Sequence, residues 1–259
     1  MIKQRYWSGL REDFLKAQPF NHIIIDDFFE PEVAEAIASE FPSYNDPVWN
    51  AHWKNAIEDK KGLNHWDKFP PTIYRAFDCL MSRAWTTLLE GIVGNTGVQA
   101  DYGLNGGGLH IHSKGGKLNV HLDYSIHPKL KLERHYNIII YMTPNWNPEW
   151  GGGLELWSHN EVNNTPKELI TTVENRFNRA VIFDTTQNSW HGLPERLDCP
   201  EGVCRQSLAA YYLTQPKINV DPRGKALFAP HKEQANDPEV LELIKRRADV
   251  AQAEKVYKK

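Results

Sequence analysis

A succession of short strands between turns is the feature that most limits how this sequence can fold. From residue 98 to residue 214, brief β-branched and aromatic segments alternate with turns rich in glycine, asparagine and proline. No helical periodicity separates them, so the pattern predicts antiparallel strands rather than strand–helix–strand units. Such strands bury their apolar faces in a sandwich or a jelly roll. The predicted strands cover residues 108–112, 117–122, 135–142, 153–157, 169–173, 179–183 and 205–213.

The N-terminal region, residues 1–97, has a different pattern. Its β-branched run within 20–29 predicts one strand, and the segment 30–41 follows with apolar residues at helical spacing. The same spacing predicts a second helix over about 72–91, with one buried face. Residues 43–69, rich in tryptophan, histidine and charged residues, are expected to be irregular. This region therefore supplies helices that support the strands.

The C-terminal extension, residues 215–259, has one predicted helix around 237–254. Its mixed charges are typical of a solvated appendage. No internal repeat or low-complexity linker divides the 259 residues, so we expect a single domain built around the 98–214 core.

The charge balance argues against one broad class of function. The 30 lysines and arginines are outnumbered by 33 aspartates and glutamates, for a formal net charge of −3. Nucleic-acid binders usually carry a basic excess, so we expect no nucleic-acid partner. No apolar run is long enough to span a bilayer, and the N-terminus lacks the apolar stretch of a secretory signal. We therefore expect no membrane partner and a cytoplasmic location; the oligomeric state stays open.

Two potential metal ligands lie two residues apart in the segment LNVHLDYS. His121 and Asp123 share one face of a predicted strand, because side chains alternate along a strand. A hydrogen-bonded pair would explain an isolated HxD equally well. A third ligand is available in RAVIFDTTQNSWHG, where His191 follows another strand. Two imidazoles and one carboxylate on one side of an octahedral ion leave three positions open, which is the arrangement of non-haem Fe(II) oxygenases.

A possible anion site follows the third histidine. In the segment CRQSLAAYYL, Arg205 begins a predicted strand and Ser207 shares its face. The planar fork of an arginine can hold a carboxylate through two hydrogen bonds, and a serine hydroxyl can add a third. A structural salt bridge would explain Arg205 taken alone, but together with His121, Asp123 and His191 it predicts a seat for the distal carboxylate of 2-oxoglutarate.

The order of these motifs resembles a known family. The chain presents HLD, then RHYNIIIYMTPNWNPEWGGGLELW, then RAVIFDTTQNSWHG, then CRQSLAAYYL. Over about residues 100–214 this order resembles the prolyl-4-hydroxylase-like branch of the 2-oxoglutarate/Fe(II) dioxygenases. In that comparison Tyr141 stands on the tyrosine-bearing strand, as a donor to the 2-oxoglutarate tail. Arg205 stands where the family has its basic residue, and His112 is near the position of a tyrosine beside the co-substrate.

The resemblance implies a mainly β fold, a double-stranded β-helix with α-helices packed on one sheet, and a C-terminal helical tail here in addition. It implies Fe(II) and 2-oxoglutarate as cofactors and O₂ as co-substrate. Its reaction would hydroxylate an organic substrate and convert 2-oxoglutarate to succinate and CO₂. The retained Asp123 indicates a hydroxylase, or a related desaturating or cyclising oxidase, rather than a halogenating enzyme. The substrate, a small molecule or a peptide, stays open among a peptidyl proline, an amino acid, a sugar and a natural-product intermediate.

Two other functions are compatible with parts of the sequence. His110 and His112 form a second pair in GLHIHSKGG, which with His191 would suit a cupin-like metalloenzyme. The glutamate that should follow such a pair is missing, so this hypothesis is weaker. A non-catalytic jelly-roll module could instead bind carbohydrate on the tryptophans of residues 43–69, although these rings also suit ordinary packing or a wall of the substrate pocket.

Overall fold

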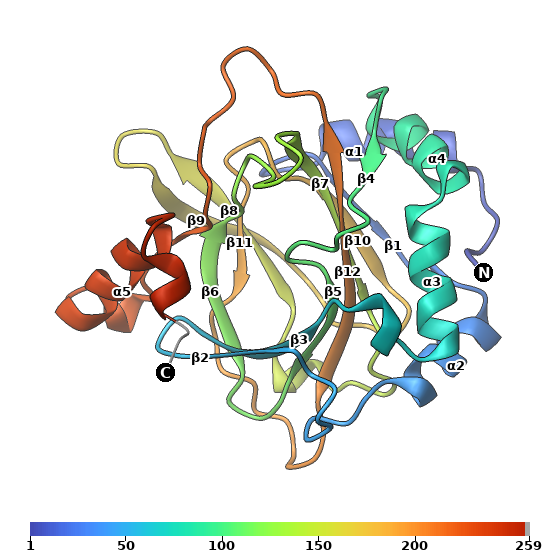
Figure 1. Ribbon diagram of the computed structural model, residues 1–259, viewed down its shortest axis with the longest axis horizontal. Coiled ribbons are helices and arrows are strands. Elements are labelled where there is room, and N and C mark those ends of the chain that lie inside the picture. The colour runs from blue at the N-terminus through green and yellow to red at the C-terminus, as the bar shows by residue number, and fades with distance from the viewer. Residues whose placement is uncertain (257–259) are drawn as a thin grey trace.

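The strands form one continuous sheet that curls into a nearly closed barrel (Figure 1). The computed structural model describes residues 1–256. The predicted fold class, a mainly β double-stranded β-helix, is confirmed. The strands are β1 (His22–Ile25), β2 (Ala51–Lys54), β3 (Glu58–Leu63), β4 (Gln99–Ala100), β5 (Gly108–His112), β6 (Lys117–Leu122), β7 (Glu133–Tyr141), β8 (Leu154–Asn160), β9 (Thr165–Val173), β10 (Ala180–Asp184), β11 (Trp190–Leu193), β12 (Arg205–Thr214) and β13 (Leu227–Phe228).

Helices flank the barrel on two sides. The α-helices are α1 (Arg11–Lys16), α2 (Pro31–Glu40), α3 (Pro71–Met81), α4 (Arg83–Val93) and α5 (Pro238–Ala248). Short 3₁₀ helices are η1 (Trp7–Leu10), η2 (Trp66–Lys68), η3 (Pro148–Trp150), η4 (Lys232–Gln234) and η5 (Ala253–Val256). Figure 1 shows α2, α3 and α4 on one side of the barrel and α5 on the other. Within residues 1–256, no helix combines the length and the apolar composition needed to cross a bilayer.

Two layers of strands build the barrel. One layer runs in the order β1-β10-β7-β12-β5, and β3 connects it to the second layer, β6-β11-β8-β9. The pairings between neighbours are antiparallel, as the short turns of the sequence predict. The largest apolar core lies between the outer face of the first layer and α2, α3 and α4. Residues of its strands therefore alternate between this core and the barrel interior.

Strand β12 illustrates this alternation. Leu208, Ala210 and Tyr212 pack in the core beneath the helices. Arg205, Ser207, Ala209 and Tyr211 line a cavity inside the barrel. The period of two along a strand makes this division, so the orientation of Arg205 follows from the burial of its even-numbered neighbours.

The structure corrects the prediction for two N-terminal segments. The single helix expected over 72–91 is two helices, because Ser82 has extended backbone (ψ 152°) and its side chain accepts a hydrogen bond from the Trp85 amide as the cap of α4. The segment 43–69, expected to be irregular, contains the β2–β3 hairpin. β3 pairs with both β5 and β6, so the hairpin is part of the barrel wall.

The prediction of a solvated C-terminal appendage is wrong. β13 pairs with β6, with Phe228 opposite His121. Val240 of α5 is buried with Ile57, Ala226 and Phe228, and Leu243 and Ile244 pack against them. The helix expected over 237–254 ends at Ala248, before η5. Its apolar stripe is short, so its burial depends on a groove that only the folded barrel provides.

Candidate metal centre and active-site cavity

The three predicted metal ligands meet inside the barrel. His121 on β6 lies directly opposite His191 on β11 in the antiparallel register, and Asp123 follows one residue after β6 ends. One potential ligand atom from each residue lies within 4.8 Å of the others. The Nε2 atom of His121 is 3.8 Å from Asp123 Oδ1, and Nε2 of His191 is 3.9 Å from Asp123 Oδ2. Among the described side chains, which leave out residues 254 and 255, no other such group of three is present.

Backbone carbonyls set the orientation of both imidazoles. The Nδ1 atom of His121 is 3.0 Å from the Asn119 carbonyl oxygen, and that of His191 is 2.7 Å from the Ser189 carbonyl oxygen. A carbonyl can only accept, so each ring carries its proton on Nδ1 and directs the Nε2 lone pair toward Asp123. This second hydrogen bond is what fixes metal-ligating histidines in proteins.

A glycine allows the two strands to approach. A Cβ added to Gly192 would lie 2.8 Å from the Leu118 carbonyl oxygen and 2.8 Å from Val120 Cα. Any side chain there would push β11 away from β6. Gly192 follows His191 directly, so the close approach serves the position of the second imidazole.

Burial keeps the cluster in the protonation state that a metal needs. Desolvation and the neighbouring His191 lower the pKa of His121 to about 3, and desolvation also lowers the pKa of His191. Burial alone would raise the pKa of Asp123, but the positive charge of Arg134, together with His191 and His121 when these are protonated at low pH, lowers it to about 2. At neutral pH the set is therefore two neutral imidazoles and one carboxylate. The Oδ2 atom of Asp123 is buried with no hydrogen-bond partner.

The cluster opens into a cavity of about 140 Å³ that also contains Arg205. The Arg205 side chain is 2% exposed, and its Nε donates to the Gly152 carbonyl at 2.7 Å. Gly152 has φ +79°, and a Cβ there would lie 3.0 Å from Arg205 Cδ. The glycine turn of the sequence thus makes room for the arginine and supplies its acceptor.

A family model described as the 2OG-Fe(II) oxygenase superfamily matches residues 107–213, the segment that holds the three ligands and Arg205. Over this segment the chain resembles the superfamily. Its fold agrees: a prolyl-4-hydroxylase from Pseudomonas putida has a TM-score of 0.52 and 15% identity, over 82% of this chain and all of that one. HygX from Streptomyces hygroscopicus, solved with nickel, 2-oxoglutarate and hygromycin B bound, has a TM-score of 0.51 and 14% identity, over 82% of this chain and 88% of that one.

A curated protein matches part of this sequence. Prolyl 3-hydroxylase OGFOD1 from Xenopus laevis is 28% identical over 106 residues, which are 39% of this chain and 20% of that protein. The match spans about a fifth of the length of the relative. The resemblance to prolyl-4-hydroxylase-like 2-oxoglutarate/Fe(II) dioxygenases inferred from the sequence is confirmed, and the substrate is not determined by it.

The donor set of this cluster fits Fe(II). Two Nε2 atoms and one carboxylate converge, Asp123 Oδ2 lacks a partner, and all three residues line the cavity. Imidazole with carboxylate is the set that holds non-haem Fe(II) and leaves open positions. His110 and His112 line the same cavity but stay outside this cluster, so the described residues do not form the ligand set of a cupin-like enzyme.

The other residues predicted to bind co-substrate lie around Arg205. Ser207 lines the cavity, and both ring nitrogens of His112 are buried there without a partner. Tyr141 is different: it is fully buried, and the Arg205 Cζ lies 5.0 Å from the centre of its ring. Tyr141 is therefore placed beneath the arginine, and its contact with Arg205 supports that side chain.

Several residues of the site have no signal in the sequence and were not predicted. Phe228 stacks on the His121 ring at 5.0 Å between centroids, and it comes from the extension predicted to be solvated. Glu58 and Lys60 come from the hairpin in the segment expected to be irregular, and Arg134 comes from the start of β7. No periodicity marks these positions, because each acquires its role from a contact distant in sequence.

The buried histidines predict a pH dependence of stability. Burial lowers the pKa of His110, His112, His121 and His191 in the folded state. Below about pH 6.5 the unfolded chain therefore binds more protons than the folded protein does. The free energy of unfolding is highest above that pH and decreases as the pH falls toward the lower pKa values of the folded state. We expect metal-free protein to lose on the order of 1 kcal/mol per pH unit for each such histidine, measured by urea unfolding from pH 7 to 5.

A matched pair of variants tests the origin of that slope. His112→Gln should reduce the slope by the share of one histidine, because three buried histidines remain, whereas His65→Gln, which changes an exposed histidine, should leave it unchanged. A wild-type free energy of unfolding that stays constant over this range would contradict the assignment.

Proposed function

We propose that this oxygenase hydroxylates an organic substrate with O₂ while 2-oxoglutarate is converted to succinate and CO₂. The observation that carries the proposal is the convergence of His121, Asp123 and His191 beside a cavity that contains a buried arginine. In this proposal the three residues hold Fe(II), and Arg205 holds the distal carboxylate of 2-oxoglutarate. Iron and 2-oxoglutarate together supply an oxidation that places one oxygen atom of O₂ in succinate and the other in the substrate.

The residues of this chain position the reactants and exclude water. Arg205 keeps its Nε on the Gly152 carbonyl, so the remainder of its guanidinium can face a carboxylate in the cavity. Ser207 and His112 add polar atoms on the same wall, and Tyr141 supports the arginine from below. Burial of these groups strengthens their attraction for an anion, because the local dielectric is low.

An anaerobic titration tests the proposed function. Protein mixed with Fe(II) and 2-oxoglutarate should develop a weak charge-transfer absorption in the visible region, and admission of O₂ should yield succinate. Arg205→Gln should raise the 2-oxoglutarate concentration needed for half of this absorption by about 30-fold or more, because it leaves a carboxylate without its cation.

The control is Arg196→Gln, which changes an exposed arginine bonded to the Gly115 carbonyl and should not alter the titration. Absence of both the absorption and any succinate from the wild-type protein would refute the proposed function. An unchanged titration in Arg205→Gln would mean that 2-oxoglutarate binds elsewhere in the cavity and not at Arg205.

A further inference from the structure

The cavity contains a second arginine whose hydrogen-bonding edge has no partner. Arg134 is 2% exposed, and its Cζ lies 3.1 Å from the centre of the Tyr211 ring and 3.9 Å from that of Tyr124. Stacking on two phenol rings occupies the faces of the guanidinium and leaves its in-plane N–H groups available. The Nε and Nη2 atoms are both buried with no hydrogen-bond acceptor. These two atoms form the edge that binds a carboxylate through two parallel hydrogen bonds.

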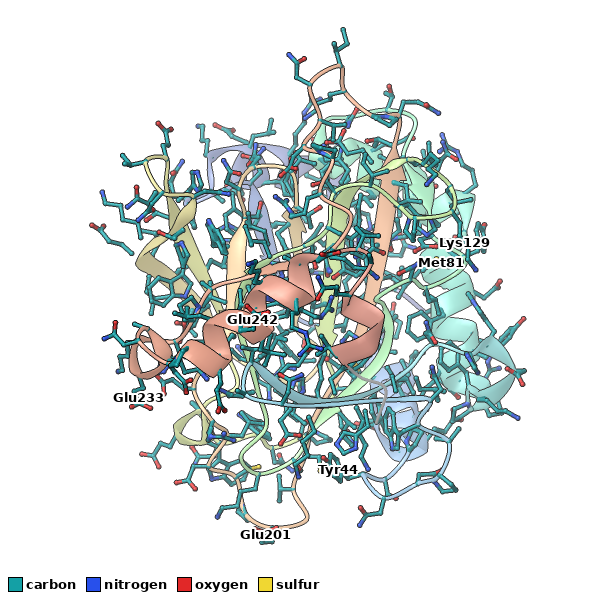
Figure 2. All side chains as sticks on the ribbon, turned by 60° about the vertical axis from the view of Figure 1, so that its left-hand side comes forward. Tyr44, Met81, Lys129, Glu201, Glu233 and Glu242 are labelled. Atoms are coloured by element: carbon teal, nitrogen blue, oxygen red, sulfur yellow. The ribbon has the colours of Figure 1, made fainter. Side chains whose placement is uncertain are left out.

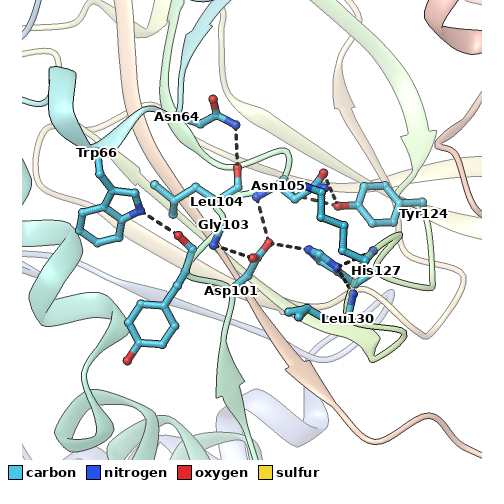
Figure 3. A network of polar contacts seen from close by, with 11 residues as sticks. Asn64, Trp66, Asp101, Gly103, Leu104, Asn105, Tyr124, His127 and Leu130 are labelled. Carbon is cyan, nitrogen blue, oxygen red and sulfur yellow. Dashed lines mark hydrogen bonds and ion pairs between the residues drawn. The ribbon is translucent and has the colours of Figure 1, made fainter.

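A polar network holds this arginine in place. Tyr124, which stacks on Arg134, donates its hydroxyl proton to the Asn105 side-chain oxygen at 2.8 Å. The Asp101 carboxylate accepts a hydrogen bond from the Asn105 backbone amide at 2.9 Å. Its Oδ2 also lies 3.5 Å from His127 Nε2, so the loops that carry these residues are in contact (Figure 3). Loops fixed in this way hold the guanidinium in one position before any ligand binds, which lowers the entropic cost of binding.

Space beside the arginine is also provided by the backbone. A Cβ on Gly106 would lie 2.7 Å from Arg134 Nη2, so any other residue there would crowd the Nη2 end of the free edge. Gly106 itself lines the cavity, as does Arg134. The Nε–Nη2 edge of Arg134 therefore has free hydrogen-bond donors, and the missing side chain of Gly106 leaves space for a ligand beside them.

The charges around the cavity favour an anion. Apart from the metal cluster and Arg205, the ionisable Asp, Glu, Lys and Arg side chains lining it are Glu58, Lys60, Arg134 and Arg247. Glu58 lies 3.7 Å from Arg247, so these two charges offset each other. Among the side chains that the structure describes, no carboxylate lies within ion-pair distance of Lys60 or Arg134. Two positive charges remain for a substrate to neutralise.

The C-terminal extension forms part of the cavity wall. Ala226 and Phe228 of the β13 region and Arg247 of α5 all line it. Figure 2 shows α5 lying across the front of the barrel. With a volume of about 140 Å³, the cavity suits a small molecule better than an extended chain.

We propose that the primary substrate is a small organic acid whose carboxylate binds the Nε–Nη2 edge of Arg134, with Lys60 as a second positive charge. This inference rests on the proposed function, in which Arg205 holds 2-oxoglutarate. It separates two anion seats in one cavity: Arg205 for the co-substrate and Arg134 for the molecule that is hydroxylated.

The test compares acids with their amides on the same protein. The proteinogenic amino acids and common 2-hydroxy acids, each also as its carboxamide, are titrated into protein saturated with Ni(II) and 2-oxoglutarate, and the thermal midpoint is followed. At least one acid should raise the midpoint while its carboxamide does not. The same acid should accelerate succinate formation by the Fe(II) protein in air.

Variants then locate the carboxylate. Arg134→Gln should weaken binding of that acid by about 30-fold or more. Arg134→Lys keeps the positive charge but lacks the two parallel N–H groups of the guanidinium, so its affinity for the acid should lie between that of Arg134→Gln and that of the wild type. The matched control is Arg75→Gln, an exposed arginine on α3, which should bind the acid as the wild type does.

Several outcomes would overturn the inference. These are amides that bind as well as acids, a panel in which no acid binds, or a peptide blocked at both ends that outperforms every acid. A loss of 2-oxoglutarate affinity in Arg134→Gln as large as that in Arg205→Gln would assign the edge to the co-substrate instead. Failure of the proposed function is distinct, because the wild type would then give neither the charge-transfer absorption nor succinate.

Discussion

Replacing Asp123 with alanine is expected to reduce the affinity for Fe(II) by about 100-fold or more, because the loss of a residue that merely supports a ligand already costs 10- to 100-fold. Asp123 contributes the only carboxylate of the cluster, and its Oδ2 has no other partner to satisfy. Without it, two neutral imidazoles remain beside the buried positive charge of Arg134, which repels a cation. Competition with a coloured chelator under anaerobic conditions measures the change, with Co(II) as a second, air-stable probe.

Two further variants separate ligation from folding. Asp123→Asn keeps the shape of the side chain and removes its charge, so it should lose most of the affinity while unfolding near the wild-type midpoint. Asp198→Ala removes a carboxylate that is 86% exposed and should change neither property. Wild-type metal affinity in Asp123→Ala would end the assignment of this residue as a ligand.

The second large effect concerns the packing of helices on the barrel. Trp85 of α4 is 1% exposed, and its ring lies 5.5 Å from Trp7 and 5.3 Å from Phe28, edge to face in both cases. Its Nε1 donates to the Tyr212 hydroxyl of β12 at 2.7 Å. Trp85→Ala should therefore lower the free energy of unfolding by about 3–5 kcal/mol, through the cavity it leaves and the hydrogen bond it breaks.

Chemical denaturation measures this change, and a neighbour on the same helix provides the control. Leu88 is 37% exposed, so Leu88→Ala should cost about 1 kcal/mol or less. Trp85→Phe keeps much of the apolar contact and should fall between the two. A Trp85→Ala protein as stable as Leu88→Ala would show that the helices contribute little to the stability of the barrel.

Much of the site follows from local sequence patterns. Side chains alternate along strands, so the two-residue spacing of His121 and Asp123 is enough to place both on one face. The same rule places Arg205 and Ser207 together, and the cavity contains both. The placement of these side chains agrees with the structure because it depends on neighbours in sequence and on a secondary structure that their own residues favour, whereas their roles stay predictions.

Other features have no local signal. The break between α3 and α4 depends on one serine acting as a helix cap within a continuous apolar stripe. The β2–β3 hairpin has few apolar residues, and its charged side chains become part of the cavity wall only when β3 pairs with β5 and β6. Burial of α5 requires the groove formed by Ile57, Ala226 and Phe228.

The sequence alone determined most strands of the 98–214 core and the order of the candidate ligands along the chain, because periodicity and side-chain chemistry are local properties. Tertiary structure decided which residues close the cavity: Phe228 reaches His121, and Arg134 lies between two tyrosines with its edge free. Those contacts join segments that are distant in sequence, and their energy depends on burial and pairing that exist only after the barrel has formed.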